Sequence, residues 1–128
     1  MYLNSRFFIT IAALSGFMVT CLGAFGAHAL KSILPLDMIN IYQTGITYQF
    51  YHTLALLLTG LMMVNFNNRS LKFSGVMFVV GIVIFSGSLY MLALTGIKQL
   101  GIITPVGGIA FLMGWLSLAV GINKKHTR

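Results

Sequence analysis

Acidic residues are almost absent from this sequence. Asp37 is the single aspartate or glutamate among 128 residues, and charged residues make up 7% of the chain. A soluble domain carries about 25% charged residues, so a chain of this composition could not cover a water-facing surface. The absence excludes an ordinary soluble domain and indicates that lipid surrounds most of the molecule.

The shortage of acids also limits the chemistry that the chain can perform. A proton-coupled exporter of this size would need a carboxylate inside a helix, whereas Asp37 lies in a link between apolar segments. The sequence has no zinc-ligand spacing and no phosphate-binding loop. The stretch "FSGSLY" at Phe85 to Tyr90 lacks the strand and turn of a nucleophile elbow. We therefore expect no enzymatic activity, no catalytic residue, no metal and no cofactor.

Cysteine and the basic residues exclude two further classes of protein. Cys21 is the only cysteine, so the chain can form no internal disulfide. The net charge of +7 comes from eight lysines and arginines. They stand in short groups between apolar runs and form no basic helix face with interleaved aromatic residues. We expect them to lie at membrane surfaces and not to bind nucleic acid.

Long apolar runs are what the sequence does contain. Four of them are long enough to cross a hydrocarbon core, which takes roughly 20 helical residues. They cover about residues 7–30, 41–66, 73–94 and 102–122. Helices are expected because lipid offers no hydrogen-bond partner to backbone groups. We predict an all-α integral membrane protein, a single domain over residues 1–128 with four transmembrane helices.

The first run also resembles a signal peptide. Arg6 precedes it, and "AHA" at Ala27 to Ala29 has the small residues of a cleavage site. However, the apolar stretch of residues 7–27 exceeds the usual 7–15 residues of a signal-peptide core. We expect a retained helix.

The links between the runs are short and predict how the helices are arranged. Pro35 cannot continue a helix, and Asp37 is a suitable N-cap for the next one. Gly96 and Gly101 interrupt the third link, and Pro105 suits a first helical turn. Short links place neighbouring helices antiparallel, which gives an up-down four-helix bundle. No internal repeat supports an inverted-repeat transporter.

Lysine and arginine positions predict the orientation. In the predicted topology, the two termini and the second link share one side and hold six of these residues, and the other side holds two. The positive-inside rule then places both termini in the cytoplasm of a multi-pass cell-membrane protein. The six are Arg6, Arg69, Lys72, Lys124, Lys125 and Arg128, and the two are Lys31 and Lys98.

Small residues form a stripe in the first and in the fourth predicted helix, at alternating spacings of three and four. Such stripes let backbones approach closely, which is how helices associate in lipid. We therefore expect packing surfaces here, either within the chain or between two copies of it. The stripes are Ala13, Gly16, Thr20, Gly23 and Ala27, and Gly107, Ala110, Gly114, Ser117 and Gly121.

Polar side chains gather in the non-cytoplasmic halves of the predicted helices. Polar groups at membrane depth are costly unless they are partnered, so they are candidates for a site. One interpretation is a structural network of interhelical hydrogen bonds, worth about 0.6–2 kcal/mol each. The other is a small-molecule site, or a haem held by His28 and His52. The candidates are His28, Tyr42, Gln49, His52, Ser86, Ser88, Tyr90 and Thr104.

Within that cluster, we predict one network that joins His28 and His52 with Gln49 and Tyr90. The outer ends of the first two helices should be neighbours, which would bring the two imidazoles to similar depth. His126 belongs to the basic tail, where we expect it to be solvated.

Four blocks of the sequence resemble the domain-of-unknown-function 423 family, which includes the transmembrane protein 256 group. They are "GAFGAHAL" from Gly23, "YQTGITYQFYHTLALL" from Tyr42, "FSGSLY" from Phe85 and "TPVGGIAFLMGW" from Thr104. One block falls in each predicted helix, so the resemblance covers nearly the whole chain. It implies a small four-span membrane protein and no established activity.

The sequence leaves two hypotheses of function. The first is a non-enzymatic membrane component that acts through packing with lipid, with a second copy or with other membrane proteins. The second is small-molecule or haem binding, which includes transport, at the outer polar cluster.

Overall fold

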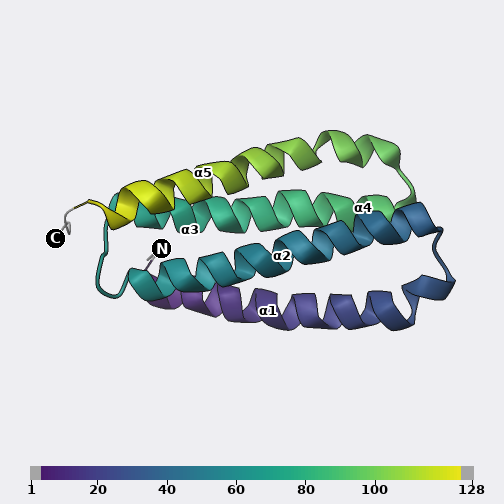
Figure 1. The fold of residues 1–128 in the computed structure, drawn as a ribbon, viewed down its shortest axis with the longest axis horizontal. Coiled ribbons are helices and arrows are strands. Elements are labelled where there is room, and N and C mark those ends of the chain that lie inside the picture. The colour runs from purple at the N-terminus through teal and green to yellow at the C-terminus, as the bar shows by residue number, and fades with distance from the viewer. Residues whose placement is uncertain (1–3, 125–128) are drawn as a thin grey trace.

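The computed structural model describes residues 4–124, which are helical over most of their length and contain no strand. Lys125, His126 and Arg128 lie outside the described residues. The prediction of an all-helical chain is therefore confirmed (Figure 1). The elements are α1 (Ser5–His28), the 3₁₀ turn η1 (Leu30–Ser32), α2 (Leu36–Met62), α3 (Arg69–Gly81), the π-helical turn η2 (Ile82–Ser86), α4 (Gly87–Thr95), the 3₁₀ turn η3 (Lys98–Ile102) and α5 (Thr104–Ile122).

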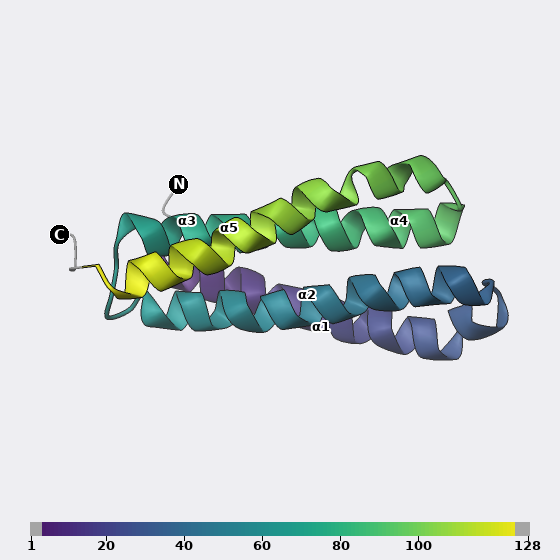
Figure 2. The same cartoon turned by 45° about the horizontal axis from the view of Figure 1, so that its top comes forward.

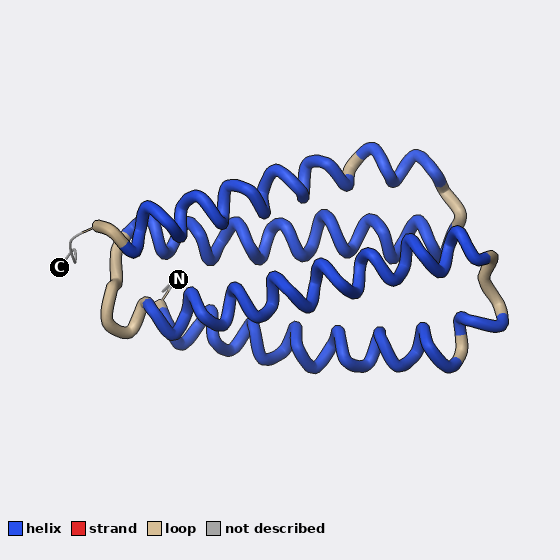
Figure 3. The backbone as a smooth tube through the Cα atoms, viewed as in Figure 1, coloured by secondary structure: helices blue, strands red, loops and turns tan. Residues whose placement is uncertain are grey.

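The long helices lie side by side and alternate in direction along the chain (Figures 1 and 3). α3, η2 and α4 follow one another without a break and form one rod. α1 pairs with α2, and α5 pairs with the α3–η2–α4 rod, so the molecule consists of two hairpins (Figure 2). α2 also contacts α3, η2 and α4, and it therefore joins the hairpins.

Three helical segments are long and apolar enough to cross a membrane. They are Ser5–Ser32, Arg69–Thr95 and Lys98–Ile122, and they correspond to the first, third and fourth predicted spans. The second predicted span, residues 41–66, corresponds to α2, which is not among the three. α2 carries polar residues that lower its mean hydropathy. Gln49 and His52 are buried, whereas Asn40, Gln43 and Thr44 are exposed.

α2 begins at Leu36, close to the predicted N-cap at Asp37, and ends at Met62, four residues before the predicted end of its span at residue 66. Its N-cap is Pro35, whose φ of −58° suits a helix start, and not Asp37, which lies in the first turn. The Asp37 carboxylate accepts a hydrogen bond only from the next backbone N–H, at 3.0 Å. Because the helix runs from Leu36 to Met62, Gln49 stands at its midpoint and His52 just beyond. The prediction that these two residues lie in the outer half is wrong.

The other helix ends follow local signals. The side chain of Asn4 caps α1 by accepting from the Phe7 N–H at 2.9 Å, and Asn68 caps α3 through the Leu71 N–H at 3.1 Å. Gly96 ends α4 in the left-handed conformation with φ of 74°, and Pro105 occupies the first turn of α5.

α5 packs against the preceding rod through its small residues, which are buried at 107, 110, 114 and 121. Large side chains at intervals of seven residues along the rod pack against glycines at the same interval along α5. A Cβ added to Gly107 would lie 2.4 Å from the backbone nitrogen of Phe85. The facing pairs are Leu71 with Gly121, Phe78 with Gly114 and Phe85 with Gly107.

The stripe predicted on α1 lies beside the buried face and not on it. Added Cβ atoms at Gly16 and Gly23 would make ordinary contacts at 3.7 and 3.9 Å, and Ala27 is exposed. The close approach occurs at Gly26, where a Cβ would lie 2.4 Å from the Tyr42 ring. The buried residues of α1 are Phe8, Ala12, Ser15 and Val19. A spacing of three and four residues places side chains on one face of a helix. It does not identify which face of α1 packs against the neighbouring helix.

The pair Gly107 and Gly108 offers a matched test of this packing. Gly107→Ala should lower the free energy of unfolding by about 1–3 kcal/mol, because the methyl group would overlap the backbone of Phe85. Gly108→Ala should be neutral or stabilising by about 0.5–1 kcal/mol, since its nearest neighbour is 3.9 Å away and alanine favours the helix. Thermal unfolding in detergent measures both. Equal effects at the two positions would contradict the predicted packing.

Candidate functional site

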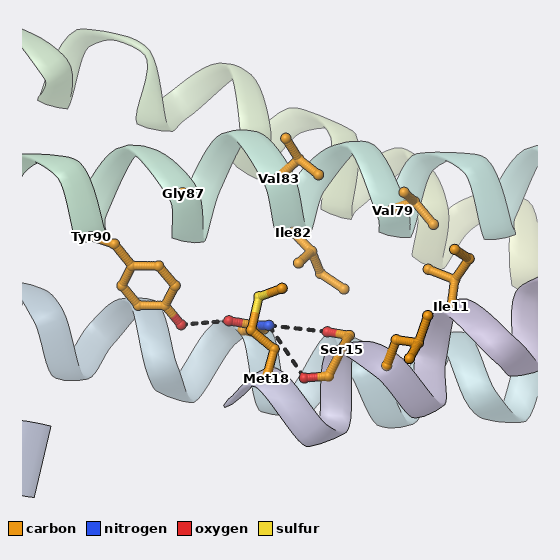
Figure 4. Close-up of a pocket in the computed structure, with 10 residues that line it drawn as sticks. Ile11, Ser15, Met18, Val79, Ile82, Val83, Gly87 and Tyr90 are labelled. Atoms are coloured by element: carbon orange, nitrogen blue, oxygen red, sulfur yellow. Dashed lines mark hydrogen bonds between the residues drawn. The ribbon is translucent and has the colours of Figure 1, made fainter. Parts of the chain in front are cut away.

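Gln49 is the centre of a hydrogen-bonded network in the middle of the molecule. Its side chain is 2% exposed. The amide nitrogen donates to the Ser15 hydroxyl at 3.1 Å, and the amide oxygen accepts from the Tyr90 hydroxyl at 2.6 Å (Figure 4). Ser15 also shares a hydrogen bond of 2.6 Å with Thr53. The network joins α1, α2 and α4, and it occupies both ends of the Gln49 amide.

A cavity of about 410 Å³ lies next to this network, between α1 and the α3–η2–α4 rod. Ser15 and Tyr90 lie on its side toward α2, and aliphatic side chains from α1 and the rod face one another across it (Figure 4). Its size is within the range of ligand pockets, about 300–1,000 Å³. The lining residues are Ile11, Leu14, Ser15, Met18, Gln49, Val79, Ile82, Val83, Gly87 and Tyr90.

The π-helical turn η2 forms part of the cavity wall. It ends at Ser86, whose hydroxyl donates to the backbone oxygen of Gly45 at 2.7 Å. The ring of Tyr90 packs closely against Gly45 of α2. A Cβ added to Gly45 would lie 2.7 Å from that ring. π-helical turns are rare and often occur at functional sites. Here the turn sets the direction of the α4 side chains that reach α2.

His52, one helical turn along α2 from Gln49, belongs to a separate aromatic cluster shared with α5. Its ring stacks on Phe111 with centroids 3.6 Å apart, and the Trp115 indole N–H donates to Nε2 at 3.0 Å. Because Nε2 accepts, the proton is on Nδ1, which donates to the backbone oxygen of Tyr48 at 2.8 Å. Both ring nitrogens are therefore engaged. The cluster contains His52, Tyr48, Phe78, Phe85, Phe111 and Trp115.

His28 is not part of either group, contrary to the prediction of one network. It is exposed at the last residue of α1. Thr53, next to His52, lies opposite Gly16, so the two histidines are separated by about 12 residues, or roughly 18 Å, along the helix axis. The physical reason is the register of α1 and α2: Tyr42 lies beside Gly26, so His52 follows ten residues after the point where α2 passes the end of α1.

Tyr42 adjoins the Gln49 network, because its ring packs against the ring of Tyr90 with centroids 5.3 Å apart. Its hydroxyl donates to the backbone oxygen of Leu22 on α1. The Ser88 and Thr104 hydroxyls are 2.6 Å apart and join α4 to α5. Ser86 and Ser88 are two positions apart on a helix, so they face different partners. The eight candidate residues therefore do not converge on one site.

A polar recess on α2 was not predicted. It has a volume of about 320 Å³ and is lined by Asn40, Gln43, Thr44, Thr47 and Tyr48. Their spacing of three and four residues places them on one face of the N-terminal half of α2. That spacing was visible in the sequence and could have identified the recess.

The described residues hold no cluster suited to a metal ion. Within residues 4–124, no three His, Cys, Asp or Glu side chains gather around a common point. Cys21 is a free thiol, exposed on α1.

Comparisons with known proteins place the chain among membrane proteins. Residues 22–108 match the family model described as "Protein of unknown function (DUF423)". The UPF0382 inner membrane protein YgdD of Escherichia coli is 45% identical over 121 residues, which cover 93% of this chain and 91% of that protein. A UPF0382 membrane protein of Staphylococcus saprophyticus is 42% identical over 119 residues, 93% of this chain and 98% of the relative. No solved structure matches the chain significantly.

The Gln49 network can be tested with a double-mutant cycle. Tyr90→Phe should lower the free energy of unfolding by about 0.6–2 kcal/mol, because it leaves the Gln49 oxygen without a donor. In a Gln49→Leu background the same change should cost less than half as much. Tyr51→Phe is the matched control, since Tyr51 is 60% exposed, and should change stability by less than about 0.5 kcal/mol. An equal cost of Tyr90→Phe in both backgrounds would rule out the bond.

Proposed function

The chain belongs to the family described as protein of unknown function DUF423, and on that premise we propose that it is a non-enzymatic component of the cell membrane. It is a helical membrane protein, as its relatives are. It acts through packing with lipid or with other membrane proteins. The observation that carries this proposal is that the polar side chains at membrane depth bond to one another across helices.

Those bonds leave few groups for chemistry. The Gln49 amide is engaged at both ends, and both nitrogens of His52 have partners. The hydroxyls of Ser15 and Thr53 bond to each other. Asp37, the one carboxylate, lies in the first turn of α2, far along the helix from His52. An arrangement in which each polar group already has a protein partner favours a structural role over catalysis.

The proposal includes four spans, with α2 as the second. A helix of 27 residues is about 40 Å long, which exceeds the roughly 30 Å of a hydrocarbon core. The polar residues in its middle face other helices and not lipid: Gln49, His52, Thr53 and Thr59 are all buried. α2 packs along α1 and along the α3–η2–α4 rod, both of which are candidate spans. The low hydropathy in the middle of α2 thus comes in part from buried residues that face other helices.

Basic residues support an orientation with both termini in the cytoplasm. Arg6, Arg69, Lys72 and Lys124 lie at the end of the bundle where both termini and the α2–α3 connection are found (Figure 1). Lys31 and Lys98 lie in η1 and η3, at the opposite end. An excess of lysine and arginine is typical of the cytoplasmic side.

Cysteine labelling of the full chain tests the number of spans and the orientation together. Cys21→Ser provides a background without thiols. In intact cells, a membrane-impermeant maleimide should label Ser32→Cys and Gln99→Cys, which lie at the outer end, and should not label Asn65→Cys until the cells are opened. Labelling of both Ser32→Cys and Asn65→Cys in intact cells would mean that α2 does not cross, and would leave three spans. Labelling of Asn65→Cys without Ser32→Cys would mean the opposite orientation.

Variants of the two histidines distinguish the structural role from haem binding, which is the alternative function. The structural role predicts the following. We expect His52→Ala to lower the free energy of unfolding by about 2 kcal/mol or more, because it opens the aromatic cluster. His28→Ala should change it by less than about 0.5 kcal/mol, since His28 is exposed. The double variant should show the sum of the two effects. A Soret band in the gently purified protein that disappears in both single variants would overturn the structural role.

A further inference from the structure

The cavity beside Gln49 lies near the middle of every helix that forms it. Its residues on α1 fall between 11 and 18, near the centre of a helix that runs from 5 to 28. Those on the rod fall between 79 and 90, within a rod that runs from 69 to 95. Gln49 is the midpoint of α2. With these helices across a bilayer, the cavity is at the depth of the acyl-chain ends.

The chemistry of the cavity suits hydrocarbon. Its polar atoms come from Ser15, Gln49 and Tyr90, which bond to one another (Figure 4). A buried water needs two to four polar partners, and these groups are already paired. The other lining residues are aliphatic, with Met18 and Gly87. An empty space would deprive those side chains of dispersion contacts.

The cavity is open toward the lipid. Leu14, Met18 and Val83 line it and are 54–65% exposed, so they form its rim. The opening exists because α1 packs mainly on α2 and not along the rod. Gly87 leaves further room inside, since a Cβ added there would meet nothing within 4 Å. A chain can therefore enter sideways from the bilayer.

We propose that this cavity binds one acyl chain of a membrane phospholipid. The chain lies between α1 and the rod and takes the place of the helix contact that is missing there. The headgroup stays at the membrane surface and makes no contact in the cavity. The inference rests on the proposed passage of α2 across the membrane, which the cysteine labelling tests separately from lipid binding.

Gly87→Leu is the variant that tests the site. It fills the cavity from within, and it removes a glycine from a helix interior, so it should preserve or raise helical stability. Ala119→Leu is the matched control, because it adds bulk on the exposed side of α5, away from the cavity. Native mass spectrometry of the full chain, released from detergent with dioleoylphosphatidylcholine, counts the bound lipid. A zwitterionic lipid is used because the net charge of +7 would attract anionic lipids to any surface.

We expect the parent chain and Ala119→Leu to retain one phosphatidylcholine each, and Gly87→Leu to retain it at least about tenfold more weakly. Dihexanoylphosphatidylcholine has the same headgroup but chains too short to reach the cavity, and it should not compete. Equal retention by Gly87→Leu, or competition by the short-chain lipid, would overturn the proposal. If circular dichroism shows that Gly87→Leu does not fold, Val83→Phe at the rim of the cavity takes its place and should lose phosphatidylcholine in the same way. Retention of phosphatidylcholine by Val83→Phe would also overturn the proposal.

Discussion

Close contact between a large side chain and a glycine is the interaction on which this structure depends. Lipid is as apolar as leucine, so helices in a bilayer gain little from hiding apolar surface, and packing must hold them together. Three of the helix interfaces here contain such a contact. Tyr42 lies on Gly26 between α1 and α2, Tyr90 on Gly45 between α2 and α4, and Phe78 on Gly114 between the rod and α5. The glycines give room, and the rings supply the contact area.

Hydrogen bonds have a second role, which is to fix register. Several polar side chains in the interior join particular pairs of helices: Ser86 bonds to Gly45 on α2, Ser88 to Thr104 on α5, and Trp115 to His52 on α2. A slip along either helix would leave such groups without partners at a depth where water cannot replace them. The bonds thus select one alignment among several that packing alone would allow. This combination accounts for the polar residues in the interior of a membrane protein.

Sequence reasoning identified the features that depend on local chemistry. Helix length in lipid, the left-handed end at Gly96, the place of Pro105 in a first turn and the small residues of α5 are all local. Features that depend on distant partners were not predicted. The π-helical turn forms where Ser86 reaches Gly45, and His52 is oriented by Trp115, 63 positions away along the chain. The buried face of α1 was misassigned by one position. Ala12, Ser15 and Val19 are buried, and the small residues of the predicted stripe each stand one position later in the sequence.

The division into two hairpins has a consequence for how the protein is made. α1 and α2 form an interface of their own, and by the time Met62 has been synthesised, Ser15, Gln49 and Thr53 can already bond to one another. The first hairpin can therefore leave the translocation channel as a nearly complete unit, with its costliest polar groups paired. The second hairpin then supplies Tyr90 and Trp115 when it docks. If α2 crosses the membrane as proposed, biogenesis in two steps lets this polar helix enter the bilayer without being exposed to lipid alone.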